Sequence, residues 1–114
     1  MIELRRIIVI DWYLFRAQQV DMRGMTAIIG PNGAGKSAII DAVQTVLTGA
    51  SMTSIRFNPS AQSNVRSKRT LRDYCLGVVS LDEKGERSEP TRQNAYTYIV
   101  LVFEDLDDGS AVSL

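Results

Sequence analysis

A glycine-rich run at residues 30–37 contains the side chains of this sequence that are best suited to chemistry. It fits the pattern G-x-x-x-x-G-K-[S/T], in which glycines allow successive backbone N–H groups to turn inward around an anion. The lysine supplies a positive charge that reaches phosphate oxygens, and the hydroxyl residue after it can ligate Mg²⁺. We therefore predict a phosphate loop (P-loop) that binds ATP and Mg²⁺, with Lys36 as the catalytic cation and Ser37 as the metal ligand. Its members are Gly30, Pro31, Asn32, Gly33, Ala34, Gly35, Lys36 and Ser37.

The elements on either side of this run are those that a P-loop requires. The apolar residues 25–29 predict a short strand that leads into the loop. After the loop, apolar residues recur at intervals of three and four, which predicts an amphipathic helix that ends at Thr48-Gly49. They are Ile39, Ile40, Val43, Val46 and Leu47. A strand, a glycine-rich turn and a helix in this order favour a nucleotide-binding loop over a glycine-rich helix terminus without a ligand.

The remaining segments predict a single α/β domain over residues 1–114, a P-loop NTPase lobe with a mixed β-sheet around the P-loop helix. Apolar residues alternate with a more mixed set over residues 2–14, which predicts a long strand. A polar stretch over residues 50–69 predicts a long loop, and the basic loop and short helix together span residues 55–76. Further predicted elements are strands at 18–22 and 78–81, a short helix at 68–76 that ends at Gly77, and a hairpin over 96–114 with strands 96–103 and 111–114 around a turn at 107–109.

The formal charge of the chain is zero, but the charges are unevenly distributed along it. Residues 1–72 contain ten Lys or Arg against four Asp or Glu, and residues 73–114 contain three against nine, so the two parts carry +6 and −6. The absence of histidine excludes Ser-His-Asp catalysis, and the lone Cys75 excludes an intrachain disulfide. The longest largely apolar run, 96–103, has eight residues, well below the ~20 of a membrane helix. We expect a cytoplasmic protein without membrane contact.

ATP hydrolysis also needs a carboxylate for Mg²⁺ and a group that activates water. Glu104 and Asp105 follow an apolar strand, but the usual order of these two acids is reversed, and the run leads into a hairpin turn rather than a crossover. We interpret them as solvent-facing acids beside a turn. The carboxylates of the Walker B motif are expected beyond Leu114, where the chain stops inside an apolar run.

Three aromatic residues at the end of the first predicted strand are candidates for contact with the adenine base. They are Trp12, Tyr13 and Phe15, and ordinary core packing is the favoured interpretation of each. The alternation of the strand groups Trp12 with its apolar residues. Tyr13 or Phe15 is therefore the better candidate for stacking.

The long loop and the short helix after it form a basic stretch. No acidic residue occurs from Ala42 to Arg72, whereas neutral hydrogen-bonding side chains are frequent there. Such a cluster can attract nucleic-acid phosphates without reading sequence. A solvated surface or a contact within a larger assembly would have the same composition. The candidate DNA-binding residues are Arg66, Lys68 and Arg69.

Residues 7–15 and 30–44 together resemble the N-terminal end of an SMC-type ABC ATPase. The segments 55–58 and 67–74 are most similar to the MukB-like branch, in particular to the JetC family of Wadjet plasmid-defence systems. The resemblance covers most of residues 1–80. The P-loop is shared by many ATPases, so the opening around Trp12 and the Arg-Phe-Asn segment carry the specific part of the likeness. Ala38 departs from it, since many relatives have Asn or Thr there.

The resemblance implies an ABC/SMC-type head lobe that a C-terminal segment completes after a long coiled coil. That segment would carry the signature motif and Walker B. It also implies that two copies of the head, a homodimer, engage around ATP and act on DNA by loop extrusion or condensation. Kleisin-like and accessory subunits would be further partners. Residues 1–114 alone would bind ATP and Mg²⁺ without turnover.

Two other functions fit the same residues. A small P-loop kinase would transfer phosphate to a metabolite and could use the loop at 50–69 as a lid, although the chain is short for both a lid and an acceptor site. A nucleotide-gated interaction module would use ATP to present the surface 55–72 to another protein. The response of DNA binding to salt separates the second possibility from DNA contact.

Overall fold

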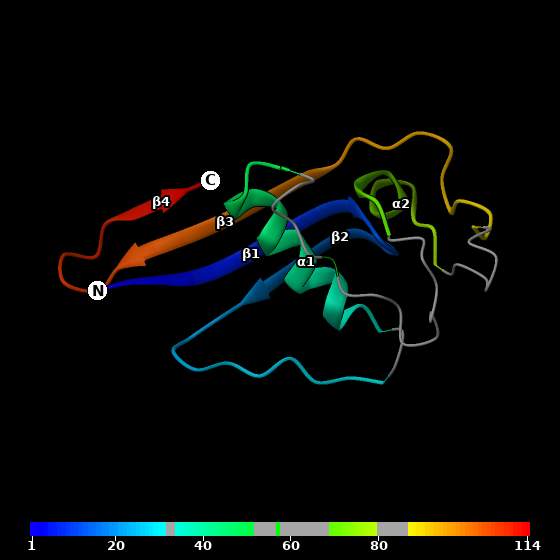
Figure 1. The fold of residues 1–114 in the computed structure, drawn as a ribbon. Coiled ribbons are helices and arrows are strands. Elements are labelled where there is room, and N and C mark those ends of the chain that lie inside the picture. The colour runs from blue at the N-terminus through cyan, green and yellow to red at the C-terminus, as the bar shows by residue number, and fades with distance from the viewer. Residues whose placement is uncertain (32–33, 52–56, 58–68, 80–86) are drawn as a thin grey trace.

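The computed structural model describes residues 1–31, 34–51, 57, 69–79 and 87–114 of the chain. In this part of the chain, four strands form one antiparallel sheet in the order β2-β1-β3-β4, and helix α1 crosses one of its faces (Figure 1). The elements are β1 (Ile2–Trp12), β2 (Phe15–Asp21), α1 (Lys36–Leu47), α2 (Leu71–Leu76), β3 (Tyr98–Asp105) and β4 (Ala111–Ser113).

Strand β1 lies in the interior of the sheet and pairs with β2 on one side and with β3 on the other. Its register on the β3 side runs from Ile2 opposite Asp105 to Ile10 opposite Tyr98. Isoleucine and valine dominate its middle, and their β-branched side chains favour an extended backbone. The predicted long strand is confirmed, although it ends at Trp12 rather than at Leu14.

The core lies between the sheet and α1. Ile7, Val9 and Leu101 are buried on the sheet, and Ile39 and the two alanines of α1, Ala38 and Ala42, are buried against the same cluster. The alanines lack bulk, so the helix axis can approach the strands closely. The first turn of the helix, directly after the P-loop, is therefore packed against the sheet.

Three predictions about the sheet are wrong for the described residues. The sheet is antiparallel throughout and not mixed. Its strand pairs are β1 with β2, β1 with β3, and β3 with β4, and the two strands of each pair run in opposite directions. Residues 25–29 form no strand: Met25 and Ile29 are almost fully exposed, at 104% and 90%. An apolar run becomes a strand only where neighbouring strands accept its hydrogen bonds, and no described strand lies beside this one. The predicted strand at 78–81 is likewise absent at 78–79, and its other residues lie outside the described ones.

Local stop signals place most of the other boundaries. Thr48 caps α1 at its C-terminus, and Gly77 ends α2 with a left-handed φ of 69°. The predicted short helix begins at Leu71, three residues later than expected, because Thr70 and Asp73 form a reciprocal capping box at its N-terminus. The predicted hairpin is confirmed, with its first strand shifted to Tyr98–Asp105.

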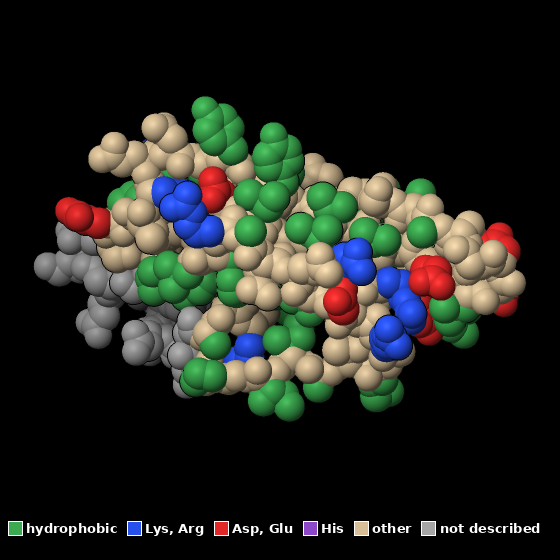
Figure 2. Space-filling view, turned by 180° about the vertical axis from the view of Figure 1, so that it is seen from behind, with side chains coloured by type: hydrophobic (Ala, Val, Ile, Leu, Met, Phe, Trp, Pro, Cys, Tyr) green, Lys and Arg blue, Asp and Glu red, His purple; other side chains and the backbone are tan. Residues whose placement is uncertain are grey.

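The basic first part and the acidic second part of the chain meet in the folded sheet. Arg5 Nε lies 3.3 Å from Glu104 Oε2 across β1 and β3, and the N-terminal ammonium lies 2.7 Å from Asp107 Oδ2. Figure 2 shows the face away from α1, where Lys or Arg and Asp or Glu side chains lie beside one another among hydrophobic ones. Both helices in the described residues are too short or too polar to cross a membrane.

Candidate functional site

The P-loop lies at the N-terminus of α1, as the sequence predicts. Asn32 and Gly33 are outside the described residues, and the others are in place. Ala34 N donates to Pro31 O at 3.1 Å, which closes a turn, and Gly35 is the N-cap of α1 with a φ of 102°. This left-handed value suits glycine and strains any other residue. The glycine in the pattern is therefore required by the backbone of this loop.

Lys36, the first residue of α1, reaches back across the loop. Its Nζ donates to the carbonyl oxygen of Gly30, at the other end of the motif. The ammonium group therefore lies beside the start of the motif and next to the positive end of the helix dipole. The first turn of α1 contains no acidic residue, and among the described residues no side chain caps it. Positive charge and helix N–H groups thus converge where a phosphate chain would compete for Lys36.

Ser37 follows directly in the first turn of α1 and is exposed. A hydroxyl oxygen beside phosphate oxygens is a ligand set that Mg²⁺ accepts, because the ion prefers hard oxygen donors and shares its sphere with nucleotide phosphates. The glycine loop, the Lys36 ammonium and the Ser37 hydroxyl therefore fit a Mg²⁺-nucleotide. The ion would neutralise charge that develops on the phosphates.

Two side chains from other elements hold α1 in place. Trp12 Nε1 donates to Ala38 O at 2.7 Å, and Tyr74 Oη of α2 donates to the Asp41 carboxylate, all in the buried core. The Trp12 and Tyr74 rings stack with centroids 4.5 Å apart and planes at 16°. Burial, together with the bond to Asp41, raises the pKa of the Tyr74 hydroxyl far above its usual value. The P-loop helix is thus bonded to β1 through Trp12 and to α2 through the neutral Tyr74.

Asp41 and Tyr74 are not among the site residues predicted from the sequence. A signal for Asp41 was present, since its position falls on the buried stripe of α1 beside Ala38 and Ala42. A carboxylate on an apolar stripe requires a hydrogen-bonding partner in the core. The identity of that partner is non-local, because Tyr74 lies 33 residues further along the chain.

The three aromatic candidates occupy different environments. Trp12 and Tyr13 are buried, at 0% and 6% exposure, within the core cluster, in agreement with the favoured interpretation of core packing. Phe15 is half-buried and lies against the P-loop: a Cβ added to Gly35 would be 2.5 Å from Phe15 Cζ. Of the three, Phe15 supplies the atoms nearest to this face of the loop glycine.

Glu104 and Asp105 lie where a hairpin places them. They end β3 next to the N-terminus, whereas the P-loop precedes α1 in another part of the molecule (Figure 1). Asp105 Oδ1 accepts from Asp107 N at 3.0 Å, and Glu104 pairs with Arg5. Their described contacts are those of acids at a strand end.

Of the three candidate DNA-binding residues, Arg66 and Lys68 lie outside the described residues. The Arg69 guanidinium carbon lies 5.0 Å from the ring centroid of Tyr74 and 5.5 Å from that of Tyr13. Its Nη2 donates to Val79 O at 3.0 Å. Arg69 therefore already has a cation–π role at the base of α2, and a contact of these residues with DNA stays a prediction.

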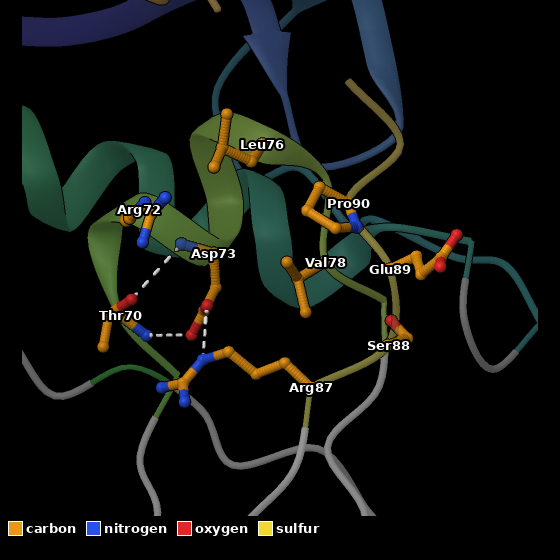
Figure 3. Close-up of a pocket in the computed structure, with 9 residues that line it drawn as sticks. All are labelled: Thr70, Arg72, Asp73, Leu76, Val78, Arg87, Ser88, Glu89 and Pro90. Atoms are coloured by element: carbon orange, nitrogen blue, oxygen red, sulfur yellow. Dashed lines mark hydrogen bonds and ion pairs between the residues drawn. The ribbon is translucent and has the colours of Figure 1, made fainter. Parts of the chain in front are cut away.

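A pocket of about 540 Å³ lies beside α2 (Figure 3). The polar groups in its wall mostly bond to one another: Arg87 Nε donates to Asp73 Oδ1 at 2.6 Å, and Thr70 N donates to Asp73 Oδ2 at 2.8 Å. The pocket wall thus ties the segment after residue 86 to the start of α2. The lining residues are Thr70, Arg72, Asp73, Leu76, Val78, Arg87, Ser88, Glu89 and Pro90.

Comparison with known proteins agrees with this geometry. Residues 4–64 match the family model described as the P-loop containing region of AAA domain. The chromosome partition protein Smc of Methanocaldococcus jannaschii is 41% identical over 59 residues, which are 51% of this chain and 5% of that protein. Smc of Bacillus subtilis is 46% identical over 55 residues, 46% of this chain and 5% of that protein.

A second kind of relative also matches the chain. The ATP-binding subunit ClpE of the ATP-dependent Clp protease from Lactococcus lactis is 32% identical over 78 residues, 68% of this chain and 10% of that protein. The chain thus spans between 5% and 10% of the length of these relatives. No solved structure matches the chain. From the family match over more than half of its residues, together with the loop geometry at α1, the chain belongs to the family of P-loop-containing AAA regions, with a P-loop segment similar to those of Smc and Clp proteins.

Proposed function

We propose that this chain is the ATP- and Mg²⁺-binding N-terminal part of an SMC-like ATPase head of the MukB-like branch, close to the JetC family of plasmid-defence systems. The observation that carries the proposal is the position of Lys36 at the N-terminus of α1, where its Nζ donates to Gly30 O at the other end of the motif. In the nucleotide-bound form, the ammonium exchanges this carbonyl for β- and γ-phosphate oxygens. Backbone N–H groups of the loop hold the phosphate chain, and Ser37 ligates Mg²⁺.

The apolar surface near the loop supports a further layer of the head. Ile40 and Leu47 of α1 are 52% and 60% exposed, and Met25 and Ile29 are more exposed still. α1 therefore carries apolar side chains on the sheet side and on its outer side. In the proposed head, residues 25–29 become a strand once the strands of the C-terminal segment pair with them, and that segment covers Ile40 and Leu47.

The same arrangement bears on catalysis. Hydrolysis requires a Walker B carboxylate beside the Mg²⁺ ion, and Glu104 and Asp105 pair elsewhere. In the proposed protein, the catalytic carboxylates belong to the C-terminal segment, and the signature motif comes from a second copy of the head. Residues 1–114 then bind ATP without turnover, and hydrolysis belongs to the completed homodimer.

DNA is the proposed substrate of the assembly, with kleisin-like and accessory subunits as further partners in the cytoplasm. The support is the excess of basic residues between Ala42 and Arg72 and the likeness to Smc, a chromosome partition protein. Arg66 and Lys68 are the proposed phosphate contacts. Arg69 contributes indirectly, because its contacts with Tyr13 and Tyr74 hold the start of α2 in place.

Nucleotide binding is tested with Lys36→Ala. The variant should lose Mg²⁺-ATP affinity by at least about a hundredfold, as expected for a charged phosphate contact whose removal costs about 3 kcal/mol. Titration calorimetry on the 114-residue chain measures it. Lys84→Ala, in the charged segment 82–92, is the matched control and should bind as the unmodified chain does. Undiminished ATP affinity in Lys36→Ala would contradict the P-loop assignment.

DNA contact is tested separately by its dependence on salt. Each phosphate contact that is lost should lower the slope of log affinity against log salt concentration by about 0.9. Arg66→Ala/Lys68→Ala should therefore lower the slope by nearly two and weaken binding to unrelated sequences by similar factors. Arg6→Ala, whose guanidinium pairs with Asp21 on the sheet, is the control. An unchanged slope in the double variant would favour a protein partner for this surface.

A further inference from the structure

The turn between β1 and β2 contacts the P-loop and the first turn of α1 at two points. Phe15 lies against Gly35, where an added Cβ would be 2.5 Å from Phe15 Cζ. Trp12, on the other side of the turn, donates from Nε1 to Ala38 O at 2.7 Å. Gly35 is buried, and its carbonyl accepts the first α1 hydrogen bond, from Ile39 N at 3.1 Å. Two aromatic rings at the strand ends on either side of this turn therefore contact the segment that contains the P-loop lysine.

The turn itself has an unusual backbone. Asp11 and Tyr13 have φ values of 48° and 53°, in the left-handed region that favours glycine. Such residues keep this conformation only where their surroundings fix it. Tyr13 N donates to Tyr74 O at 2.7 Å, and Thr97 Oγ1 donates to Asp11 O at 2.7 Å. Residues far along the chain, Tyr74 and Thr97, thus hold the turn in this conformation.

Arg92 supplies the largest number of these outside contacts. Its Nη2 donates to Tyr13 O at 2.8 Å and to Phe15 O at 3.3 Å, and its Nη1 donates to Cys75 O at 2.8 Å. Its Nε lies 3.8 Å from Asp11 Oδ1, and the side chain is only 14% exposed. A planar guanidinium presents several donors in fixed directions, so one side chain can hold carbonyls of the turn and of α2 together. Lysine has a single ammonium and cannot match this geometry.

We propose that Phe15 and Arg92 are positioning residues of the nucleotide site. Arg92 fixes the carbonyls of the β1–β2 turn, the turn fixes the Phe15 ring, and the ring fixes Gly35 in the conformation that directs the P-loop toward phosphate. The contacts of neither residue, as described above, include Lys36 or Ser37, and both act through Gly35. This inference rests on the proposed function, because it assigns these residues to the same phosphate site.

The position of Phe15 also separates two roles for its ring. A ring that stacks on adenine contributes to ATP binding and not to the binding of inorganic tripolyphosphate. A ring that supports Gly35 contributes to both equally, because both ligands use the P-loop. The contact with Gly35 assigns Phe15 to the second role.

The experiment measures the dissociation constants of Mg²⁺-ATP and Mg²⁺-tripolyphosphate by calorimetry, at a temperature where thermal melts show each variant folded. Phe15→Leu keeps an apolar side chain without the ring, and Phe15→Tyr keeps the ring. Arg92→Lys keeps the charge. Phe15→Leu and Arg92→Lys should each weaken both ligands by the same factor, about tenfold, as for other groups that orient a binding site. Phe15→Tyr should retain the affinity for both ligands to within about twofold of the unmodified chain. Arg6→Lys, a change of the same type at an exposed ion pair on β1, should have no effect.

The outcomes distinguish this inference from the proposed function. If Arg92→Lys melts at a lower temperature but binds both ligands as the unmodified chain does, Arg92 has a structural role only and the inference fails. A loss of ATP affinity alone in Phe15→Leu would assign the ring to adenine and would also overturn it. Phe15→Leu decides the matter by itself if Arg92→Lys does not fold. If the unmodified chain binds neither ligand, the proposed function fails first.

Discussion

The bond between Tyr74 and Asp41 gives the sharpest prediction about stability. Tyr74→Phe removes one hydroxyl that donates to a buried carboxylate, with the two residues 2% and 1% exposed. A hydrogen bond to a charged group contributes about 1.5–3 kcal/mol. The stacking on Trp12 needs only the ring, so the variant should lose about 2 kcal/mol of unfolding free energy. For a chain of this size that corresponds to a fall in Tm of about 8 °C.

The same bond predicts a dependence on alkaline pH. The pKa of Tyr74 is raised in the folded chain by burial and by Asp41, whereas an unfolded tyrosine ionises near pH ~10. The stabilising contribution is therefore complete below pH ~10. Above it, the unfolded chain releases a proton that the folded chain keeps, and stability falls by up to ~1.4 kcal/mol per pH unit. Tyr74→Phe lacks this term, so its stability should fall less steeply there.

Urea unfolding between pH ~7 and ~11 measures both effects. The chain has a single tryptophan, Trp12, whose ring lies on Tyr74, and its fluorescence follows unfolding of this core. Tyr98→Phe is the matched control, because Tyr98 is 61% exposed and should change stability by less than ~0.5 kcal/mol. If Tyr74→Phe behaves as Tyr98→Phe does in both its midpoint and its alkaline slope, the bond does not stabilise α1 and the reasoning is refuted.

Two further predictions concern the helix termini. Burial would raise the pKa of the Asp73 carboxyl, but the bonds from Arg87 and Thr70 outweigh it and lower that pKa; its stabilising contribution is then complete above pH ~4 and is lost as the pH falls below it. Asp73→Asn should therefore lower the free energy of unfolding by about 1–2 kcal/mol at neutral pH. In thermal melts at a series of pH values, its Tm should also fall less than that of the unmodified chain below pH ~4. An equal fall of Tm in both chains would contradict this. Gly35→Ala should abolish ATP binding and lower stability by more than ~1 kcal/mol, because φ is 102° and Phe15 occupies the space; Gly24→Ala, with a φ of 57° and no atom within 4 Å, should retain ATP affinity in the same titration.

The parts of the fold that sequence predicts well depend on local signals. The alternation in β1, the spacing of Ile39, Val43 and Leu47 in α1, and the glycine that ends α2 all act within a few residues. The P-loop belongs to this group, since its spacing alone identifies the phosphate cradle and the lysine. Its location at the start of α1 follows from the same residues.

The parts that sequence does not predict depend on distant partners. Residues 25–29 have the composition of a strand, but pairing decides whether such a run becomes one. Arg92 lies at the end of a stretch rich in charged residues, 82–92. Its guanidinium nevertheless donates to the carbonyls of Tyr13 and Phe15, which lie 79 and 77 positions earlier in the chain. Backbone carbonyls carry no sequence signature, so no pattern in the chain indicates which ones an arginine will bind.

The central position of β1 also determines the order in which this chain can fold during synthesis. Strand β1 is synthesised well before its partner β3, because Ile2 pairs with Asp105, more than a hundred positions later. The hairpin with β2 can form early, since Trp12 lies opposite Phe15, and it covers one edge of β1. The other edge of this isoleucine- and valine-rich strand has no pairing partner on the ribosome until β3 emerges. A pause in translation before that point therefore exposes an unpaired strand edge that can aggregate with neighbouring nascent chains.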